Sequence, residues 1–138
     1  LGDWCAVDIV ADPTAGAWPP QVARLAMVHR DPAMLALGEA LTRRYPTDWS
    51  AEGGMAAVLR SGTPFFVPEV TDAMVVAGAR DAEHLRLLRA LRFASILVVP
   101  LVARGRTLGA LTLCMTESGR RYDADDLALA QDVAQRAA

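Results

Sequence analysis

The sequence predicts an α+β domain with an antiparallel sheet, from two observations. Two apolar runs of strand length flank Arg104-Gly105-Arg106 within the segment Ser95–Gly119, which is typical of a β-hairpin whose turn glycine takes positive φ. Helical patterns gather mainly in the middle of the chain, between this hairpin and a pair of strands near the N-terminus. Strands and helices segregated in this way are typical of α+β domains rather than of alternating β-α units.

The length and charge of the chain limit the classes of protein that it can represent. Its 138 residues can form one hydrophobic core but are too few for two ordinary domains, so we expect a single domain over residues 1–138. A net charge of -2 without a clustered basic surface argues against nucleic acid as a partner. No apolar run reaches membrane-spanning length, and no signal peptide opens the chain. We therefore expect a cytoplasmic protein that does not bind a membrane.

The first two predicted strands form a hairpin. The segment 4–12 alternates, with Cys5, Val7 and Ile9 on one face. The segment 22–29 is its partner, and strict alternation would place Leu25 on the same face as Met27 and opposite to Arg24. Turn signals at Asp12-Pro13 and at Trp18-Pro19-Pro20 mark the loop between the strands. His29, at the end of the second strand, is expected at the surface.

Helix signals dominate the middle of the chain. Asp31 is placed to cap a helix with Pro32 in its first turn, and that helix should end at Tyr45-Pro46. A short helix over 55–60 is stopped by Gly62, and a brief strand follows over 63–67. Asp72 is placed to cap another short helix, and a clearer helix is predicted over 81–92.

The C-terminal segment gives the sharpest local predictions. The run 96–102 is apolar at every position, which favours a strand buried on both faces in the middle of the sheet. Pro100 donates no ladder hydrogen bond and predicts a bulge or a locally unpaired edge. Gly109 allows another group to approach closely. Asp123 and Asp126 have the spacing of a capping box at the start of the last helix.

Four segments of the chain resemble the GAF domain family, which is related to PAS domains. They are DWCAVDIV, VLRSGTPFFVPEVTD, HLRLLRALRFASILVVPLVARGRTLGALTL and ESGRRYDADDLALAQDVAQRAA, and together they extend over almost the whole sequence. The resemblance implies a GAF/PAS-like central antiparallel sheet of five to six strands with helices on both sides. It further implies a regulatory, non-catalytic domain of a bacterial signalling protein, such as a sensor histidine kinase or a regulatory serine phosphatase.

Two departures from the family pattern shape what we expect of the parent protein. GAF domains commonly begin with a helix, whereas this chain starts at a strand, and its last helix has no stop signal. We expect a domain excised from a longer chain, whose terminal helices form a homodimer and lead to an output module. The effector domain of a transcription regulator is an alternative.

The residues expected to line a small-molecule pocket come mostly from the middle of the chain. His84 shares a helical face with Leu87, Leu88 and Leu91, so its imidazole should point towards the core or a pocket, where it could bind a ligand or a metal such as haem iron. The simpler alternative is a hydrogen-bonded, half-buried histidine. The full predicted set is Trp49, Met55, Phe65, Phe66, His84, Leu88 and Cys114. Apolar residues of this kind also pack ordinary cores, and the sequence identifies no cofactor.

The two cysteines allow a redox alternative. Some GAF-fold enzymes reduce free methionine sulfoxide with clustered, exposed cysteines. Cys5 and Cys114 each lie within a strand-like run, which favours a structural role for both. No glycine-rich phosphate loop, paired-cysteine zinc pattern or nucleophile elbow occurs, so we assign no catalytic or metal-binding residue.

Overall fold

The computed structural model describes residues 3–12, 16, 18–116 and 121–137. Its sheet has five strands, all antiparallel, in the order β2-β1-β5-β4-β3. The strands are β1 (Trp4–Val10), β2 (Val22–His29), β3 (Phe65–Val67), β4 (Ser95–Ala103) and β5 (Arg106–Met115). The helices of the described residues are α1 (Pro32–Arg44), α2 (Gly54–Ser61), α3 (Asp72–Gly78), α4 (Ala82–Leu91) and α5 (Ala124–Ala137).

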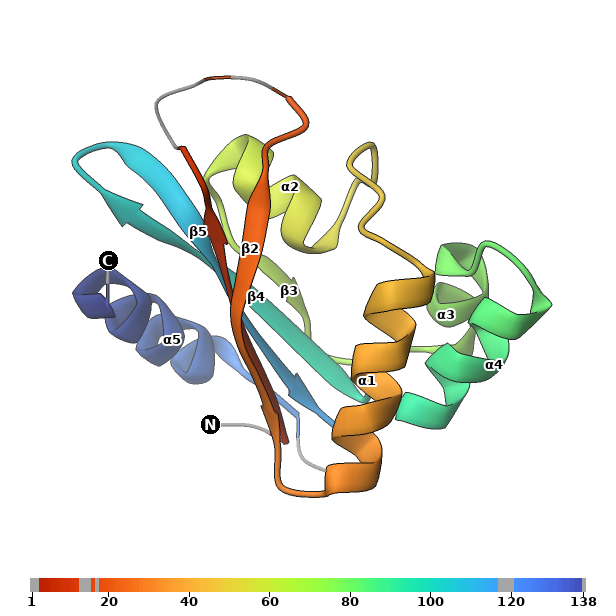
Figure 1. The fold of residues 1–138 in the computed structure, drawn as a ribbon. Coiled ribbons are helices and arrows are strands. Elements are labelled where there is room, and N and C mark those ends of the chain that lie inside the picture. The colour runs from red at the N-terminus through yellow and green to blue at the C-terminus, as the bar shows by residue number, and fades with distance from the viewer. Residues whose placement is uncertain (1–2, 13–15, 17, 117–120, 138) are drawn as a thin grey trace.

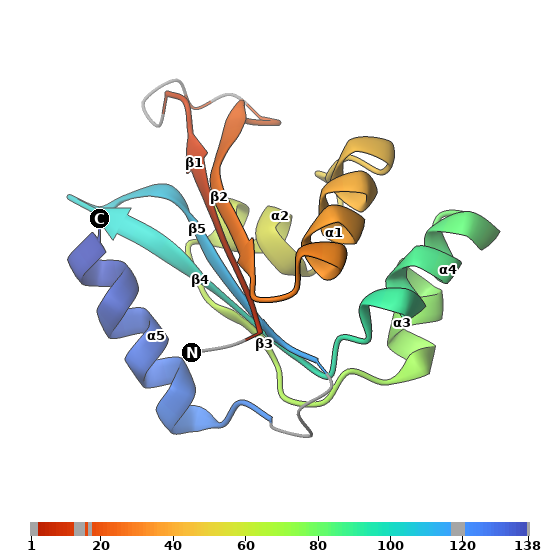
Figure 2. The same cartoon turned by 60° about the horizontal axis from the view of Figure 1, so that its bottom comes forward.

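The helices are divided between the two faces of the sheet. Figures 1 and 2 show α5 on one face and the group α1 to α4 on the other. The predicted α+β class, with five strands and helices on both sides, is therefore confirmed. The turn signal at Pro13 and the end of the hairpin segment beyond Thr116 lie outside the described residues.

The hairpin of β4 and β5 forms the centre of the sheet, as its apolar runs predict. The pairing of β3 with β4 ends at Phe65 and Val98, two residues before Pro100. On the β3 side of the sheet, Pro100 therefore has no neighbouring strand that would need its missing N–H. The β4–β5 register shifts one residue later, between Leu101 and Val102. Of the two alternatives predicted from Pro100, the locally unpaired edge is therefore present, whereas the nearby register shift leaves its extra residue, Leu108, in β5.

Two glycines of this hairpin have distinct geometric roles. Gly105 takes the predicted positive φ of 74° in the turn, and Arg104 beside it also has a positive φ, of 52°. That pair of conformations matches a type I′ turn, which follows the twist of the strands. Gly109 lies against β1, where a Cβ atom would overlap the carbonyl oxygen of Asp8. The predicted close approach is thus made by the neighbouring backbone.

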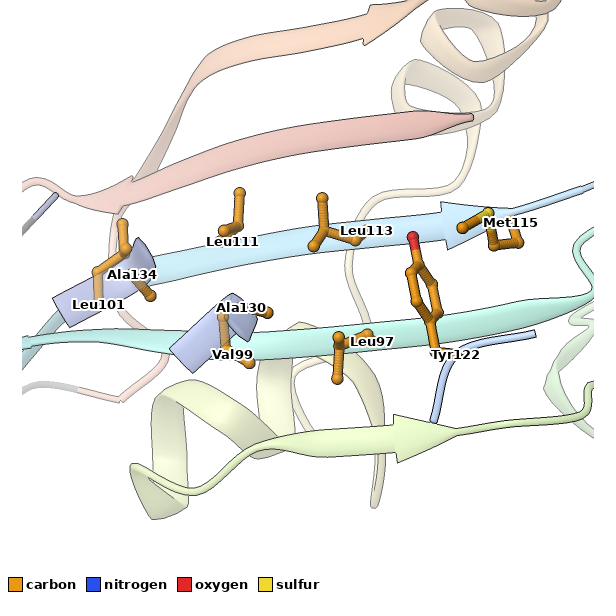
Figure 3. Packing of buried hydrophobic residues seen from close by; sticks show 9 residues of the cluster. All are labelled: Leu97, Val99, Leu101, Leu111, Leu113, Met115, Tyr122, Ala130 and Ala134. Carbon is orange, nitrogen blue, oxygen red and sulfur yellow. The ribbon is translucent and has the colours of Figure 1, made fainter. Parts of the chain in front are cut away.

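The side chains between the sheet and α5 form the largest apolar cluster. Figure 3 shows residues of β4 and β5 facing two alanines of the helix, with the Tyr122 ring beside them. The buried members are Leu97, Val99, Leu101, Leu111, Leu113, Met115, Tyr122, Ala130 and Ala134. The small alanine side chains allow α5 to lie close to the sheet. The predicted capping box begins this helix, because Asp123 and Asp126 exchange hydrogen bonds between side chain and backbone N–H, each of 2.9 Å.

The N-terminal hairpin departs from strict alternation. A register shift between Val7 and Asp8 pairs Asp8 with Arg24 and leaves Leu25 as the extra residue of a bulge. Arg24 and Met27 consequently lie on the same face, so the opposition of Arg24 to Met27 expected from strict alternation is wrong. Leu25 is 67% exposed.

Helix caps in the middle of the chain mostly follow the sequence signals. Asp31 caps α1 through a 3.0 Å bond from the Ala33 N–H, and Asp81 caps α4 through a 2.8 Å bond from the His84 N–H. The helix expected to begin with Asp72 as its cap instead uses Thr71, whose hydroxyl accepts from the N–H of Met74. Thr71 is the better cap because its backbone is extended, whereas Asp72 already belongs to the first turn.

The helix α3 is attached at the outside of this layer. It contains no buried residue and packs on α4, to which an Arg89–Asp72 ion pair also joins it. Its apolar Met74 and Val76 are exposed.

Candidate functional site

A cavity of about 180 Å³ lies between the sheet and helix α1, and we call it the Trp4 cavity. Its floor comes from β1, β2 and β5, and its walls come from α1, the end of α4 and the segment after α4. Most of its lining is apolar, with three polar side chains. The lining residues are Trp4, Ala6, Arg24, Met27, Gly38, Leu41, Thr42, Leu91, Phe93, Thr112 and Cys114.

Trp4 is the largest side chain of this cavity and is held on several sides. It is 6% exposed, and a Cβ atom at Gly38 of α1 would overlap its ring, so glycine is needed there for the helix to lie this close. The rings of His29 and Phe93 meet the indole edge to face at centroid distances of 4.7 Å and 6.3 Å. The indole nitrogen is buried and has no hydrogen-bond partner among the described residues. His29, expected at the surface, is half-buried through this contact.

An ion pair between the buried Asp8 and the partly exposed Arg24 forms the polar side of the cavity. The guanidinium of Arg24 donates to both carboxylate oxygens of Asp8, at 2.8 Å and 3.1 Å, and Asp8 is 2% exposed. The third guanidinium nitrogen donates to the Thr42 hydroxyl at 3.3 Å, and that hydroxyl donates to the carbonyl of Gly38 at 3.0 Å. The network therefore ties β1 and β2 to α1, and the bulge of β2 is what brings Arg24 to this face.

The remaining polar groups of the cavity belong to β5. The Thr112 side chain makes no hydrogen bond within the described part of the chain. Burial raises the pKa of the Cys114 thiol to about 12, so the thiol stays protonated and behaves as a small apolar group. Cys114 is the one predicted pocket residue that lines this cavity.

An outer groove of about 350 Å³ adjoins the Trp4 cavity, and we call it the Leu25 groove. The two hollows share Arg24, Met27 and Thr42, so these three side chains stand between the inner cavity and the outer groove. The groove is also lined by Leu25, Ala26, Glu39 and Arg43.

His84 lies outside both hollows and is held by the helix layer. Its Nδ1 accepts a 3.0 Å bond from the Arg80 N–H, and its ring stacks on Tyr45 at 4.2 Å. The Tyr45 hydroxyl donates to Asp81, which also caps α4. Burial lowers the pKa of the imidazole, and the nearby Arg80 charge lowers it further. This arrangement corresponds to the simpler alternative for His84.

The other predicted pocket residues are dispersed. Trp49 meets the exposed Trp18 edge to face at 5.6 Å, near the surface. Met55 and Phe65 pack around Val58, Val98 and Ala110, which form a separate small cluster. Phe66 points to the opposite face of the sheet, against the α5 cluster. Leu88 is half-buried on α4 and does not line either hollow.

The two cysteines lie on opposite faces of the sheet. Cys114 faces the Trp4 cavity, whereas Cys5 packs against the α5 cluster. Burial raises the pKa of both thiols, which opposes the thiolate form that redox chemistry requires. The geometry does not bring the pair together as a nucleophile and resolving partner.

Two further features concern the described residues alone. No group of three or more His, Cys, Asp or Glu side chains has the arrangement to hold a metal ion there. Within that same part, none of the helices has the length and apolar character needed to cross a bilayer.

Comparison with known proteins gives the family of this α+β domain. The GAF domain model matches residues 2–138, so the chain belongs to the GAF domain family. Comparison with curated proteins found no match. GAF domains are in general regulatory and sensory.

Solved structures support this assignment at the level of the fold. The GAF-B domain of DevS from Mycobacterium smegmatis is 15% identical, with a TM-score of 0.59 over 99% of this chain and 77% of that one. A GAF domain/HD domain protein from Geobacter sulfurreducens is 18% identical, with a TM-score of 0.61 over 99% and 78%. A domain assigned to a two-component sensor histidine kinase from Sinorhizobium meliloti 1021 is 15% identical, with a TM-score of 0.59 over 99% and 76%. At these identities the likeness is one of fold.

Proposed function

We propose that this domain is the sensory module of a signalling protein and that it binds a small molecule in the Trp4 cavity. The observation that carries the proposal is a mostly apolar cavity with a few fixed polar groups, which is the usual character of a small-molecule site. Its volume of about 180 Å³ lies below the range of about 300–1,000 Å³ that is typical for drug-sized ligands. The ligand is therefore a small one.

Strand β5 supplies a physical route from the cavity to α5. Thr112 and Cys114 face the cavity, whereas the alternating Leu111, Leu113 and Met115 pack against α5. A ligand that favours one position of β5 would shift the packing of α5 only if it binds the two arrangements unequally. We propose that α5 passes this change to an output module in the same chain, as the sensor histidine kinase context of one structural neighbour suggests.

The outer surface of α5 supports a homodimer as part of this proposal. Leu129 and Val133 lie four residues apart on the helix and are both exposed, while Ala130 and Ala134 face the sheet. An exposed apolar pair at this spacing suits helix–helix contact between two copies. The two unbridged cysteines favour a reducing compartment, so we place the protein in the cytoplasm.

Native mass spectrometry after incubation with a metabolite extract tests ligand binding and dimerisation together. We expect the wild-type protein to retain a small molecule and the Ala6→Ile variant to lose it, because the larger side chain fills the floor of the cavity. Ala23→Ile is the matched control, since Ala23 is exposed on β2 and lines neither hollow. A wild-type protein that retains nothing, or an Ala6→Ile variant that retains as much as wild type, would contradict the proposed ligand site.

A further inference from the structure

The inner lining of the Trp4 cavity is almost inaccessible to solvent. Leu91 at the end of α4 is 1% exposed and Cys114 on the floor is 5% exposed. Trp4 and Ala6 of the same lining are buried as well. A small organic molecule therefore reaches the inner lining only when some side chain of the cavity moves.

Three side chains form a partition between this cavity and the Leu25 groove. Arg24, Met27 and Thr42 line both hollows, and the side chain of Arg24 is 32% exposed. Met27 closes the space between β2 and α1, since its Sδ lies 3.4 Å from the position that a Cβ atom of Gly38 would take. Because β2 is the edge strand of the sheet, no further strand covers the partition from outside.

The hydrogen bonds of this partition are unequal in strength. Arg24 donates to both oxygens of Asp8 at 2.8 Å and 3.1 Å, and breaking these bonds would leave a buried carboxylate unpaired, which is strongly unfavourable. Its bond to Thr42 is longer, at 3.3 Å, and its acceptor is an uncharged hydroxyl. That hydroxyl keeps its 3.0 Å bond to the Gly38 carbonyl when Arg24 is released. The Arg24–Thr42 bond can therefore break while Arg24 stays on Asp8.

Met27 is the adaptable member of the partition. Its side chain is unbranched and has three rotatable bonds, so it can change rotamer where a branched residue could not. The adjoining Leu25 groove, of about 350 Å³, has room to receive it. One rotamer change and the loss of one hydrogen bond are thus sufficient to join the two hollows.

We propose that the Leu25 groove is the entrance to the Trp4 cavity and that Arg24, Met27 and Thr42 form its gate. The gate opens when the Arg24–Thr42 bond breaks and Met27 turns into the groove, while Arg24 remains paired with Asp8. This inference goes beyond the proposed function, because it gives the outer groove a role and requires no bound ligand.

Cys114 makes the opening of this gate measurable, because its thiol lines the inner cavity. In a Cys5→Ala parent, which lacks the thiol on the other face of the sheet, methyl methanethiosulfonate is a small uncharged reagent for Cys114, and intact mass follows the reaction. Labelling through a local gate exposes little new surface, so its rate should change little with urea below the unfolding transition. Labelling through global unfolding would rise steeply with urea. We expect the first behaviour.

Two gate variants of this parent should change the labelling rate in opposite directions. Thr42→Val keeps the shape of the side chain without the hydroxyl and should label Cys114 about two- to tenfold faster, as the loss of one net hydrogen bond provides. Met27→Ile replaces the flexible side chain by a stiff one of similar size and should label more slowly. Thr107→Val, on β5 but outside both hollows, is the matched control and should label at the parent rate.

The outcomes distinguish the gate from the proposed function. The gate is wrong if Cys114 of the parent is labelled only with a steep dependence on urea, or not at all below the unfolding transition. It is also wrong if Thr42→Val labels no faster than Thr107→Val, or if Met27→Ile labels faster than the parent. Should Thr42→Val be less stable overall, the urea dependence of its labelling shows which opening is responsible. Labelling as expected without a ligand retained in mass spectrometry would leave the gate and remove the proposed ligand site.

Discussion

Gly109 fixes how closely two central strands can approach each other. A Cβ atom there would overlap the backbone oxygen of Asp8, which cannot rotate away as a side chain can. We expect Gly109→Ala to lower the free energy of unfolding by about 3 kcal/mol, at the upper end of the usual cost of overpacking. Urea denaturation followed by circular dichroism measures this loss.

Gly78 provides the matched control for that substitution. It lies at the end of α3 with no atom within 4 Å of a Cβ position, so Gly78→Ala should change stability by no more than about 1 kcal/mol, and in the stabilising direction. Equal stability of wild type and Gly109→Ala would show that β1 and β5 can separate without cost.

His84 gives the domain a defined dependence on pH. Its pKa in the folded state is lowered from 6.5 by burial and by Arg80, against a smaller opposing effect of Asp81. The unfolded chain therefore takes up this proton first, and stability should fall as the pH decreases below about 6.5. The pKa values of Asp72, Asp81 and Asp123 are also lowered, from 3.8, so their contribution is lost only below about pH 4.

Unfolding measurements at pH 7.5 and pH 5.5 isolate the histidine from these carboxylates. The wild-type protein should be less stable at pH 5.5, whereas His84→Gln should lose less over the same interval. Glutamine can still accept the Arg80 N–H but carries no titrating group in this range. The same loss in both proteins would assign the effect to another residue.

Single residues were harder to predict for the site than for the fold. The sequence indicates that His84 faces inward, and it does, but helical spacing cannot show that Tyr45 fills the space in front of it. Trp4 enters the expectations from the sequence only as the start of a strand, although a tryptophan on the face opposite to Cys5 is an available signal. Thr112 gave no signal, because a hydroxyl without a partner becomes visible only when its surroundings are known.

At the scale of one element, α5 depends on its small residues. Ala130 and Ala134 are fully buried against β4 and β5 (Figure 3). We expect Ala130→Leu to lower the free energy of unfolding by about 1–3 kcal/mol, because the helix must move away from the sheet. Ala128→Leu, on the exposed side of the same helix, should change it by less than about 0.5 kcal/mol. Thermal and urea unfolding compare the two, and equal losses would mean that packing distance is not the cause.

Elements themselves were predicted well where local chemistry determines them. The cap at Asp31 and the turn at Gly105 depend on neighbouring residues alone, and both are as expected. The bulge in β2 depends instead on the pairing of two strands, so alternation within one strand could not reveal it. That same bulge turns Arg24 towards the Trp4 cavity. Alternation within β2 therefore could not predict that Arg24 forms the polar side of the cavity.

At the scale of the molecule, the order of the apolar segments along the chain was sufficient to predict the fold class and the central hairpin of the sheet. Fully apolar β4 and the hairpin that it forms had to occupy the centre of the sheet, and the remaining strands then add at its edges. The cavity could not be predicted in the same way, because it is defined by where α1 meets the sheet. Its position depends on long-range packing, such as that of Gly38 against Trp4.

The weak attachment of α3 has a consequence for how the domain comes apart. A helix without a buried residue, held to α4 by an exposed ion pair, can detach without exposing the core of the sheet. We therefore expect two tiers of cooperativity, with a sheet-and-α5 core that opens by global unfolding and an outer helix that opens on its own. Substitutions in α3 would therefore leave the melting of the core unchanged while altering how often the outer layer is open to proteases.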